Sequence, residues 1–217
     1  ESSYTDRQLR EIEYHKSHAA KMADRSTEPV PLDVIEDAPR RWWNAFWSTY
    51  DLLLQHDLQG KRVLVPGCGF AADAIRLARC GAAVYAFDIS PDIVDMARQR
   101  VERLGADNVH LSVAAFESLD YDDDFFDFAV FFDILHHVDI PRAMAEIRRV
   151  MKPDGWLIGD ELYTHSFLQR HVRESWLVKR LLYPRMHDFI YGRRDSYITE
   201  DEHKIDETEF DLIRRQC

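Results

Sequence analysis

Two glycines and an acid have the types and the spacing of a site for a nucleoside. Gly67 and Gly69 follow the apolar run Arg62–Pro66, and a backbone without Cβ atoms can turn sharply and lie close to a ligand. Asp88 comes nineteen residues after Gly69, and a carboxylate there can accept hydrogen bonds from the hydroxyls of a ribose. A helix over residues 71–79 would direct its free N–H groups at the loop. The stretch therefore predicts a site for an anion or a polar nucleoside cofactor.

Alternating strands and helices must hold this loop in place. The patterns predict strands over 62–66, 83–87, 109–113, 125–132 and 156–162, and Asp88 directly follows the second of them. Helices are predicted over 71–79, over 91–104 with Ser90 as its N-cap, and from Pro141 to near Met151; Lys152–Gly155 is predicted to be a turn. This alternation predicts an α/β fold with a doubly wound, mainly parallel sheet, whose ligands bind at the carboxyl ends of the strands.

The segments on either side of this core are predicted to be helical covers. Residues 4–24 predict an amphipathic helix, and residues 27–39 contain three prolines and predict a loop. Trp42, Phe46 and Tyr50 recur every four residues in an aromatic helix, which either packs on the flank of the sheet or forms a lid. Residues 165–183 predict a helical cap, the acidic stretch 199–211 a solvated surface, and 207–215 a last helix. We therefore divide the chain into an N-terminal helical lid (1–59), a cofactor-binding core (60–164) and a cap with the last helix (165–217).

Composition and charge exclude several classes of protein. A length of 217 residues fits one domain, and 46% hydrophobic residues can form a sizeable core. A net charge of −11 argues against nonspecific binding to nucleic acid or to an anionic membrane. No apolar run approaches the length of a membrane span, and no signal-peptide pattern opens the chain. Three cysteines without a CxxC pair argue against a disulfide framework or a zinc site, so we expect a reducing, cytoplasmic setting.

Four further features follow the glycine loop and the acid in a fixed order. They are Ala115–Leu119 after the third strand, the acidic turn Asp122–Asp124, Asp133–Val138 after the fourth strand, and the turn Lys152–Gly155. The ordered set resembles the class I S-adenosylmethionine-dependent methyltransferases of the small-molecule type, over about residues 60–162. The resemblance implies a Rossmann-like sheet with strand order 3-2-1-4-5, S-adenosylmethionine as cofactor and S-adenosylhomocysteine as product. It also implies that the last strands of the usual seven are absent from this chain.

The resemblance assigns the cofactor contacts residue by residue. Gly67 and Gly69, with Pro66 and Cys68 of the same loop, would lie against the methionine part, Asp88 would hold the ribose, Ile89, Ala115 and Phe116 would border the adenine, and Phe132 the sulfonium. The family usually has an acid where this chain has Val65, and the loop together with Asp73 is similar to the thiol, halide and thiopurine methyltransferase branch. We therefore expect Asp73 to contact the amino group of the cofactor; the alternative is an acid favoured at a helix start. Nothing else supports that branch, so its substrates are not carried over.

Methyl transfer is an in-line displacement at a sulfonium methyl, so the enzyme mainly aligns the acceptor and excludes water. A hydroxyl or a protonated amine also needs a base. His136 and His137 lie where the family places acceptor-facing residues; adjacent helical residues point in different directions, so only one can face the acceptor, and the two are not a chelating pair. No metal is therefore predicted. Tyr163 is a third catalytic candidate, and Asp133, Glu161 and His165 are further candidates; the alternatives are structural histidines and a packed Tyr163.

Two other functions stay open at this point. The spacing of Gly67, Gly69 and Ala72 before Asp88 also fits a nicotinamide-dependent oxidoreductase, which predicts a second βαβαβ half that this chain lacks. A non-catalytic cofactor-binding protein on the same fold predicts binding without turnover. Asp133–His136 is not the motif with which nucleic-acid methyltransferases stack on a flipped base, so the acceptor is predicted to be a small molecule. We expect the protein to be a monomer or a homodimer.

Overall fold

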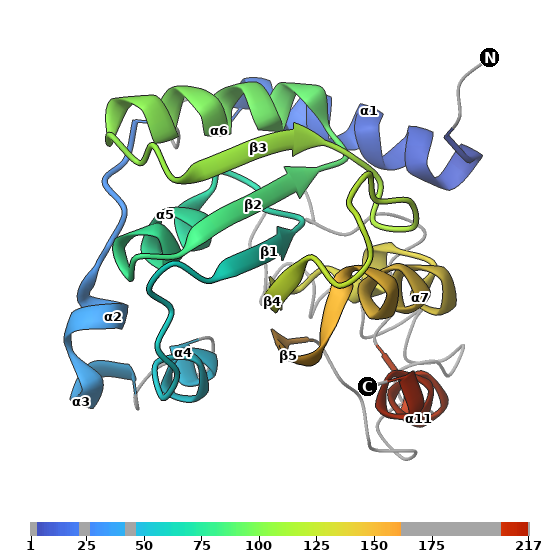
Figure 1. Ribbon diagram of the computed structural model, residues 1–217. Helices are drawn as coiled ribbons and strands as arrows, with labels where there is room; N and C mark the ends of the chain where they lie inside the picture. Colours follow the sequence, from blue (N-terminus) through green and yellow to red (C-terminus); the bar gives the residue numbers. More distant parts are fainter. Residues whose placement is uncertain (1–3, 22–26, 42–46, 162–204, 217) are drawn as a thin grey trace, which may run out of the picture.

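The computed structural model describes residues 4–21, 27–41, 47–161 and 205–216 (Figure 1). Within them, five strands form one sheet in the order β3-β2-β1-β4-β5, and every neighbouring pair is parallel. The strands are β1 (Arg62–Pro66), β2 (Ala83–Asp88), β3 (Val109–Val113), β4 (Phe126–Phe132) and β5 (Met151–Asp160). The predicted Rossmann-like, doubly wound fold with strand order 3-2-1-4-5 is confirmed.

The central strand β1 has both faces covered. Val63 and Val65 lie in one apolar cluster, and Leu64 lies in the other, because successive side chains of a strand point to opposite faces. Parallel pairing aligns the last residue of β1, Pro66, with Phe87 on β2, so the loops that follow both strands start at the same edge. The neighbour of β1 on its other side is β4. The strands that follow β1 along the chain therefore lie on both sides of it, and the strand order reverses at this point.

Helices cover both faces of the sheet. They are α1 (Asp6–Lys21), α2 (Asp33–Glu36), α3 (Ala38–Arg41), α4 (Ser48–Leu53), α5 (Ala72–Arg79), α6 (Pro91–Arg103), α7 (Ile140–Val150), α11 (Glu207–Gln216) and a 3₁₀ turn, η3 (Leu135–His137). The cluster that contains Val63 includes buried residues of α4, α5 and α6, and the cluster that contains Leu64 includes those of α7. Figure 1 shows α1 beside α6 and α11 beside α7. Among the described helices, none has the length and apolar character needed to cross a membrane.

Two local predictions were wrong. The proline-containing segment 27–39 is not all loop, because α2 occupies Asp33–Glu36 and α3 begins at Ala38, with Pro39 in its first turn. Lys152–Gly155 belongs to β5: Met151 pairs with Phe126 and Trp156 pairs with Phe128, so the four residues between them bulge out of the ladder. The proline and the glycine of this segment signal a break in pairing, and the sequence alone did not separate a bulge from a turn.

Capping residues fix two helices at the carboxyl edge. Ser90 caps α6 as predicted, and its hydroxyl accepts a hydrogen bond from the N–H of Ile93 (3.4 Å). Asp139, which the sequence analysis did not single out, caps α7 and accepts from the N–H of Arg142 (3.1 Å). The predicted last helix is confirmed as α11. The predicted cap over 165–183 and the irregular segment after it lie outside the described residues.

Arginines of the core hold the segment that connects α1 to α2. Arg76 on α5 donates to the carbonyl of Pro31 (3.0 Å), and Arg100 on α6 donates to the carbonyl of Glu28 (2.9 Å). Arg100 also donates to the carbonyl of Phe70 in the glycine loop (3.1 Å). Because these guanidinium groups are largely buried, they fix the path of the described residues that precede α2.

The segment before β4 is fixed by an ion pair on α7. The Glu146 carboxylate accepts from the N–H of Leu119 (2.8 Å) and from Arg149 (2.9 Å), and Arg149 in turn donates to the carbonyls of Leu119 (2.8 Å) and Tyr121 (2.7 Å). The hydrogen bond from Arg149 is the main cause that lowers the pKa of Glu146. A carboxyl whose pKa is lower in the folded state stabilises the fold above its unfolded pKa and loses that contribution as the pH falls.

We therefore expect Glu146→Gln to lower the free energy of unfolding by about 1 kcal/mol at pH 7, because a net hydrogen bond in a protein contributes about that much. The difference from the wild-type protein should shrink as the pH falls toward 4, and urea titrations at both pH values measure it. Glu102→Gln, an exposed position on α6, is the control and should change little at either pH. A difference that is the same at pH 7 and pH 4 would contradict the electrostatic role of Glu146.

Candidate active site

The loop between β1 and α5 depends on glycine for two different reasons. Gly67 has a φ of +60°, and a Cβ placed on it would lie 2.6 Å from Cδ1 of Ile134, so the loop after β4 packs directly on its Cα. Gly69 has a φ of +49°, and no described atom lies within 4 Å of a Cβ placed there. Ala71, which precedes α5, also has a left-handed backbone (φ +58°). The loop is therefore tightly packed at Gly67 and faces open space at Gly69.

Asp88 ties this loop to the one after β2. Its Oδ2 accepts from the N–H of Gly69 (3.1 Å), and its Oδ1 accepts from the N–H of Ser90 (3.1 Å). The side chain is only 7% exposed, and burial raises the pKa of its carboxyl, while His15 of α1 and these N–H groups oppose the rise. A carboxylate oxygen can accept more than one hydrogen bond, so both oxygens keep acceptor capacity for the ribose hydroxyls predicted to bind here.

The acid at the start of α5 lies in a network that reaches two other elements. The Asp73 Oδ1 accepts from the hydroxyl of Tyr50 on α4 and from Arg76 (2.8 Å). Burial raises the pKa of the Tyr50 phenol well above its ordinary value, and the charge of Asp73 adds to the rise, so the hydroxyl stays a donor. The Tyr50 ring stacks on Phe132 at the end of β4, with centroids 5.8 Å apart. Tyr50 of the predicted aromatic helix thus packs on the sheet and contacts a predicted cofactor residue, whereas Trp42 and Phe46 lie outside the described residues.

The residues predicted to border the adenine lie in different environments. Ala115 makes an isolated bridge with Ser118, and Ile89 is half-buried after β2. Phe116 is buried in the core, and its ring packs edge-to-face on that of Phe87, with the ring centroids 5.7 Å apart. Its side chain therefore supports the loop after β3 from the core. Two residues of the glycine loop also bind to β2. Pro66 is buried and pairs with Phe87, and Cys68 donates its N–H to the Phe87 carbonyl (2.9 Å).

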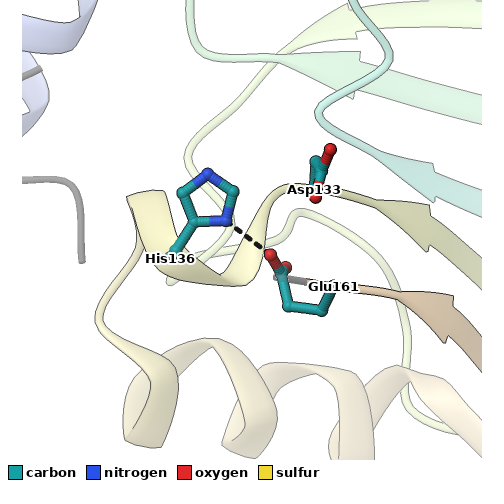
Figure 2. Close-up of side chains that lie close together, drawn as sticks. All are labelled: Asp133, His136 and Glu161. Carbon is teal, nitrogen blue, oxygen red and sulfur yellow. Dashed lines mark hydrogen bonds and ion pairs between the residues drawn. The ribbon is translucent and has the colours of Figure 1, made fainter. Parts of the chain in front are cut away.

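The end of β4 carries the predicted proton acceptors. Asp133 has a left-handed backbone (φ +48°), and the chain then forms η3, which contains both histidines. His136 is 3% exposed, and its Nδ1 lies 2.5 Å from Oε1 of Glu161. Glu161 follows β5, and its Oε2 accepts from the N–H groups of Ile134 (3.0 Å) and Leu135 (2.6 Å). Figure 2 shows Glu161 reaching from the end of β5 to the ring of His136, with Asp133 on the neighbouring strand end.

His137 has a different partner from His136. Its Nδ1 lies 3.4 Å from Oε1 of Glu11, a buried residue of α1, and the two histidine rings lie 4.2 Å apart. The two rings thus lie close together but contact different carboxylates, and the prediction that only one of them faces the acceptor stays a prediction. Tyr163 and His165 lie outside the described residues, so their predicted roles stay predictions.

The first helix contacts the loops of the site through several polar side chains. Arg7 donates to the carbonyl of His136 (3.2 Å), and Gln8 donates to the Glu117 carboxylate (2.9 Å). Glu117 also accepts from the N–H of Asp139 (3.0 Å). Glu11 completes the row of contacts through His137. Because these partners come from the loops after β3 and β4, α1 covers the carboxyl edge of the sheet. The amphipathic pattern predicted the helix but not these individual contacts.

Three side chains at the strand ends could hold a cation. One ligand atom each of Asp133, His136 and Glu161 lies within 4.8 Å of the other two. Asp160 lies next to Glu161, and burial, followed by the charge of Glu161, raises the pKa of its carboxyl and so favours its neutral form. Imidazole and carboxylate groups bind divalent metals, but the Nδ1 of His136 and the Oε1 of Glu161 already contact each other in this structure.

Comparisons with known proteins agree with this geometry. A family model described as a methyltransferase domain matches residues 64–159. The ubiquinone biosynthesis O-methyltransferase of Coxiella burnetii is 26% identical over 193 residues, which cover 82% of each chain. Residues 64–159 are thus a methyltransferase domain of the class I type. The predicted methyltransferase is thus confirmed, and the cofactor that this family implies is S-adenosylmethionine.

Two solved structures share the fold of the methyltransferase. YcgJ from Bacillus subtilis has a TM-score of 0.57 and 21% identity, over 76% of this chain and 65% of YcgJ. Magnesium protoporphyrin IX methyltransferase from Synechocystis, solved with bound S-adenosylmethionine, has a TM-score of 0.50 and 24% identity, over 69% of this chain and 73% of that chain. The nicotinamide oxidoreductase that the glycine spacing left open is not favoured.

The two loop glycines should respond differently to substitution by alanine. A left-handed backbone costs a residue with a Cβ about 1–2 kcal/mol, so both Gly67→Ala and Gly69→Ala should lose stability. Gly67→Ala should lose clearly more, because its Cβ would collide with Ile134. Gly69→Ala should stay folded but bind S-adenosylmethionine more weakly, because its methyl group would enter the open space. Urea unfolding and calorimetry measure both effects, and equal losses of stability would contradict the packing argument.

Proposed function

We propose that this methyltransferase transfers the methyl group of S-adenosylmethionine to a small molecule at the carboxyl edge of the sheet. The observation that carries the proposal is the convergence of the glycine loop, Asp88 and the end of β4 beside the open space at Gly69. The parallel register brings these groups together, since the ends of β1, β2 and β4 lie side by side. Ligands of doubly wound sheets bind at this edge.

The cofactor contacts are proposed for the residues that the sequence analysis assigned. Gly67 and Gly69 would let the methionine part approach the backbone, and Asp88 would accept hydrogen bonds from the ribose. Ile89 and Ala115 would border the adenine, with Phe116 buried beneath them. Phe132, held by the Tyr50 ring, would border the sulfonium, and Asp73 would receive the amino group. Pro66 and Cys68 would act through the backbone of the loop, which Cys68 joins to β2.

Exclusion of water is proposed as the task of the lid. The sulfonium is already a good leaving group, so the rate depends mainly on alignment of the acceptor and on a dry site. The contacts of α1 with the loops after β3 and β4 support a lid made of the N-terminal helices. The domain division into residues 1–59, 60–164 and 165–217 and the cap after β5 remain parts of the proposal.

The acceptor class is inferred from charge and from relatives. The acidic chain and the absence of the base-flipping motif favour a small molecule over a nucleic acid. The relative from Coxiella burnetii is named as an O-methyltransferase of ubiquinone biosynthesis, which supports an oxygen acceptor. A cytoplasmic location and a monomer or homodimer stay proposals that rest on cysteine usage and on the family.

Asp88→Asn tests the proposed cofactor site. An amide presents one oxygen and one N–H₂ group, so it cannot accept from both Gly69 and Ser90 or serve the ribose as a carboxylate does. We expect the affinity for S-adenosylmethionine and S-adenosylhomocysteine to fall at least about tenfold, as hydrogen bonds to charged groups contribute about 1.5–3 kcal/mol. Calorimetry measures it, with Asp95→Asn on the exposed face of α6 as the control. Tighter binding of NADH than of the adenosyl ligands would overturn the proposal.

A pair of ligands separates the two roles left open for Asp73. S-adenosylmethionine carries the amino group, and 5′-methylthioadenosine lacks the whole amino-acid part. If Asp73 receives the amino group, Asp73→Asn should weaken binding of S-adenosylmethionine about tenfold or more and leave 5′-methylthioadenosine unchanged. Tyr50→Phe, which removes the hydroxyl that holds Asp73, should show a smaller effect in the same direction. Equal weakening of both ligands in calorimetry would instead mean that Asp73 only supports the start of α5.

A further inference from the structure

We propose that Arg7 of α1 binds a carboxylate group of the methyl acceptor, so that the substrate of this methyltransferase is a small carboxylic acid. The inference deepens the proposed function and rests on it for the methyl donor and for the place of the reaction. Its starting point is a guanidinium group whose donors the described part of the protein leaves largely unused.

Arg7 has more hydrogen-bond donors than acceptors to meet them. A guanidinium group carries five N–H donors. Within the residues that the structure describes, Arg7 has one acceptor, the carbonyl of His136, which lies 3.2 Å from Nη2. The Nε atom is buried and has no hydrogen-bond partner. Buried donors without acceptors are rare in native proteins, so the unpaired Nε marks a place where an acceptor from outside the chain fits.

The charge of Arg7 is also left without a partner of opposite sign in the described part of the chain, since the atom that it binds belongs to a carbonyl. Glu11 lies one turn further along α1 but faces two histidines instead. Its Oε1 lies 3.4 Å from Nδ1 of His137, and its Oε2 lies 3.7 Å from Nε2 of His15. A buried donor and an unneutralised charge on one side chain together indicate an anionic ligand.

The contact with His136 places Arg7 on the acceptor side of the proposed cofactor site. The ends of the strands follow each other in the order β2-β1-β4-β5, and the proposed cofactor lies on the loops after β1 and β2, which Asp88 joins. The part of the edge that remains for the acceptor is therefore at β4 and β5. Arg7 binds η3, the turn that follows β4.

A carboxylate fits these donors better than the other common acceptors. Two N–H groups of a guanidinium match the two oxygens of a carboxylate, and the charges add to the hydrogen bonds. A ketone or an amide offers one uncharged oxygen. A phosphate group carries up to two negative charges, and the acids that face this corner, Glu11, Asp133 and Glu161, favour a ligand with only one.

The carboxylate of S-adenosylmethionine is the competing ligand. It is bonded to the same carbon as the amino group, which is proposed to meet Asp73. Asp73 contacts Tyr50 and Arg76, and among the described residues no hydrogen bond joins any of these three to Arg7. We therefore assign Arg7 to the acceptor.

The neighbour of Arg7 fixes the first turn of α1 in place. Gln8 donates to the Glu117 carboxylate (2.9 Å), which also accepts from the N–H of Asp139 at the start of α7 (3.0 Å). The backbone that carries Arg7 is thus held against two loops of the site. A carboxylate bound by Arg7 would add a further contact between α1 and the carboxyl edge, so binding of the acceptor would also help to exclude water.

The first test separates the two carboxylates. Calorimetry compares S-adenosylmethionine with 5′-methylthioadenosine, which lacks the amino-acid part, on wild-type protein and on Arg7→Gln. We expect the substitution to leave both affinities unchanged, because Arg7 does not serve the cofactor. A loss of affinity for S-adenosylmethionine alone would assign Arg7 to the carboxylate of the cofactor and overturn the inference.

The second test uses a matched pair of acceptor probes. The probes 3,4-dihydroxybenzoate and 3,4-dihydroxybenzamide differ in charge but little in shape, and each is titrated into protein saturated with S-adenosylhomocysteine. We expect wild-type protein to bind the acid at least about tenfold more tightly than the amide, as hydrogen bonds between charged groups provide. Arg7→Gln should bind both alike, and Arg7→Lys should keep part of the preference, because lysine retains the charge but not the fork.

Controls give each outcome one meaning. Arg10→Gln removes the same charge from an exposed position on α1 and should keep the preference for the acid. Loss of the preference in Arg10→Gln as well would mean a general effect of charge and would overturn the inference. Equal binding of the two probes by wild-type protein, or no binding of the acid, would overturn it too. If wild-type protein instead fails to bind S-adenosylmethionine and S-adenosylhomocysteine, the proposed function fails and this inference fails with it.

Discussion

Backbone N–H groups at the carboxyl edge of a parallel sheet need acceptors, and much of this structure follows from how they find them. The strands end at one edge, and the loops that leave them can no longer pair with a neighbouring strand. Buried or half-buried carboxylates take over this task. Asp88 accepts from the loops after β1 and β2, and Glu161 accepts from the turn after β4. Each acid thus joins elements that are far apart in the sequence.

The same acids preorganise the site for a ligand. A charged group that is held by N–H donors needs no rearrangement before it meets a ligand, and this preorganisation is a large part of what an enzyme contributes. Burial raises the pKa of Asp88. Its carboxylate nevertheless holds the glycine loop in a conformation that leaves open space at Gly69. Glu161 holds η3 and the ring of His136 together. The acidic balance of the chain therefore lies partly inside the molecule, where it is structural.

The N-terminal helix adds a second layer over this edge. Its contacts reach the loop after β3 through Gln8 and the turn after β4 through Arg7 and Glu11. Arginines of α5 and α6 hold the residues that precede α2 through the carbonyls of Pro31 and Glu28. In a displacement that needs a dry site, a helix that covers this edge suits the chemistry.

The sequence by itself determined the sheet, its loops and the family. Apolar runs, capping residues such as Ser90, and glycines with an acid at a fixed distance are local signals, because strand burial, helix starts and positive φ angles are set by nearby residues. Local signals did not separate a bulge from a turn at Lys152–Gly155, since both use proline and glycine to interrupt pairing. Nor did they show that the proline-rich segment contains α2 and α3.

The partners of the chemical groups follow from the tertiary structure. Tyr50 meets Asp73, Glu11 meets His137, and Glu161 meets His136, across 23, 126 and 25 positions of the chain. No periodicity or spacing encodes such pairs, because they depend on which strand ends lie side by side and on which helix crosses them. The sequence named the two histidines as equal candidates. The fold made them unequal by giving one a partner at the end of β5 and the other a partner on α1.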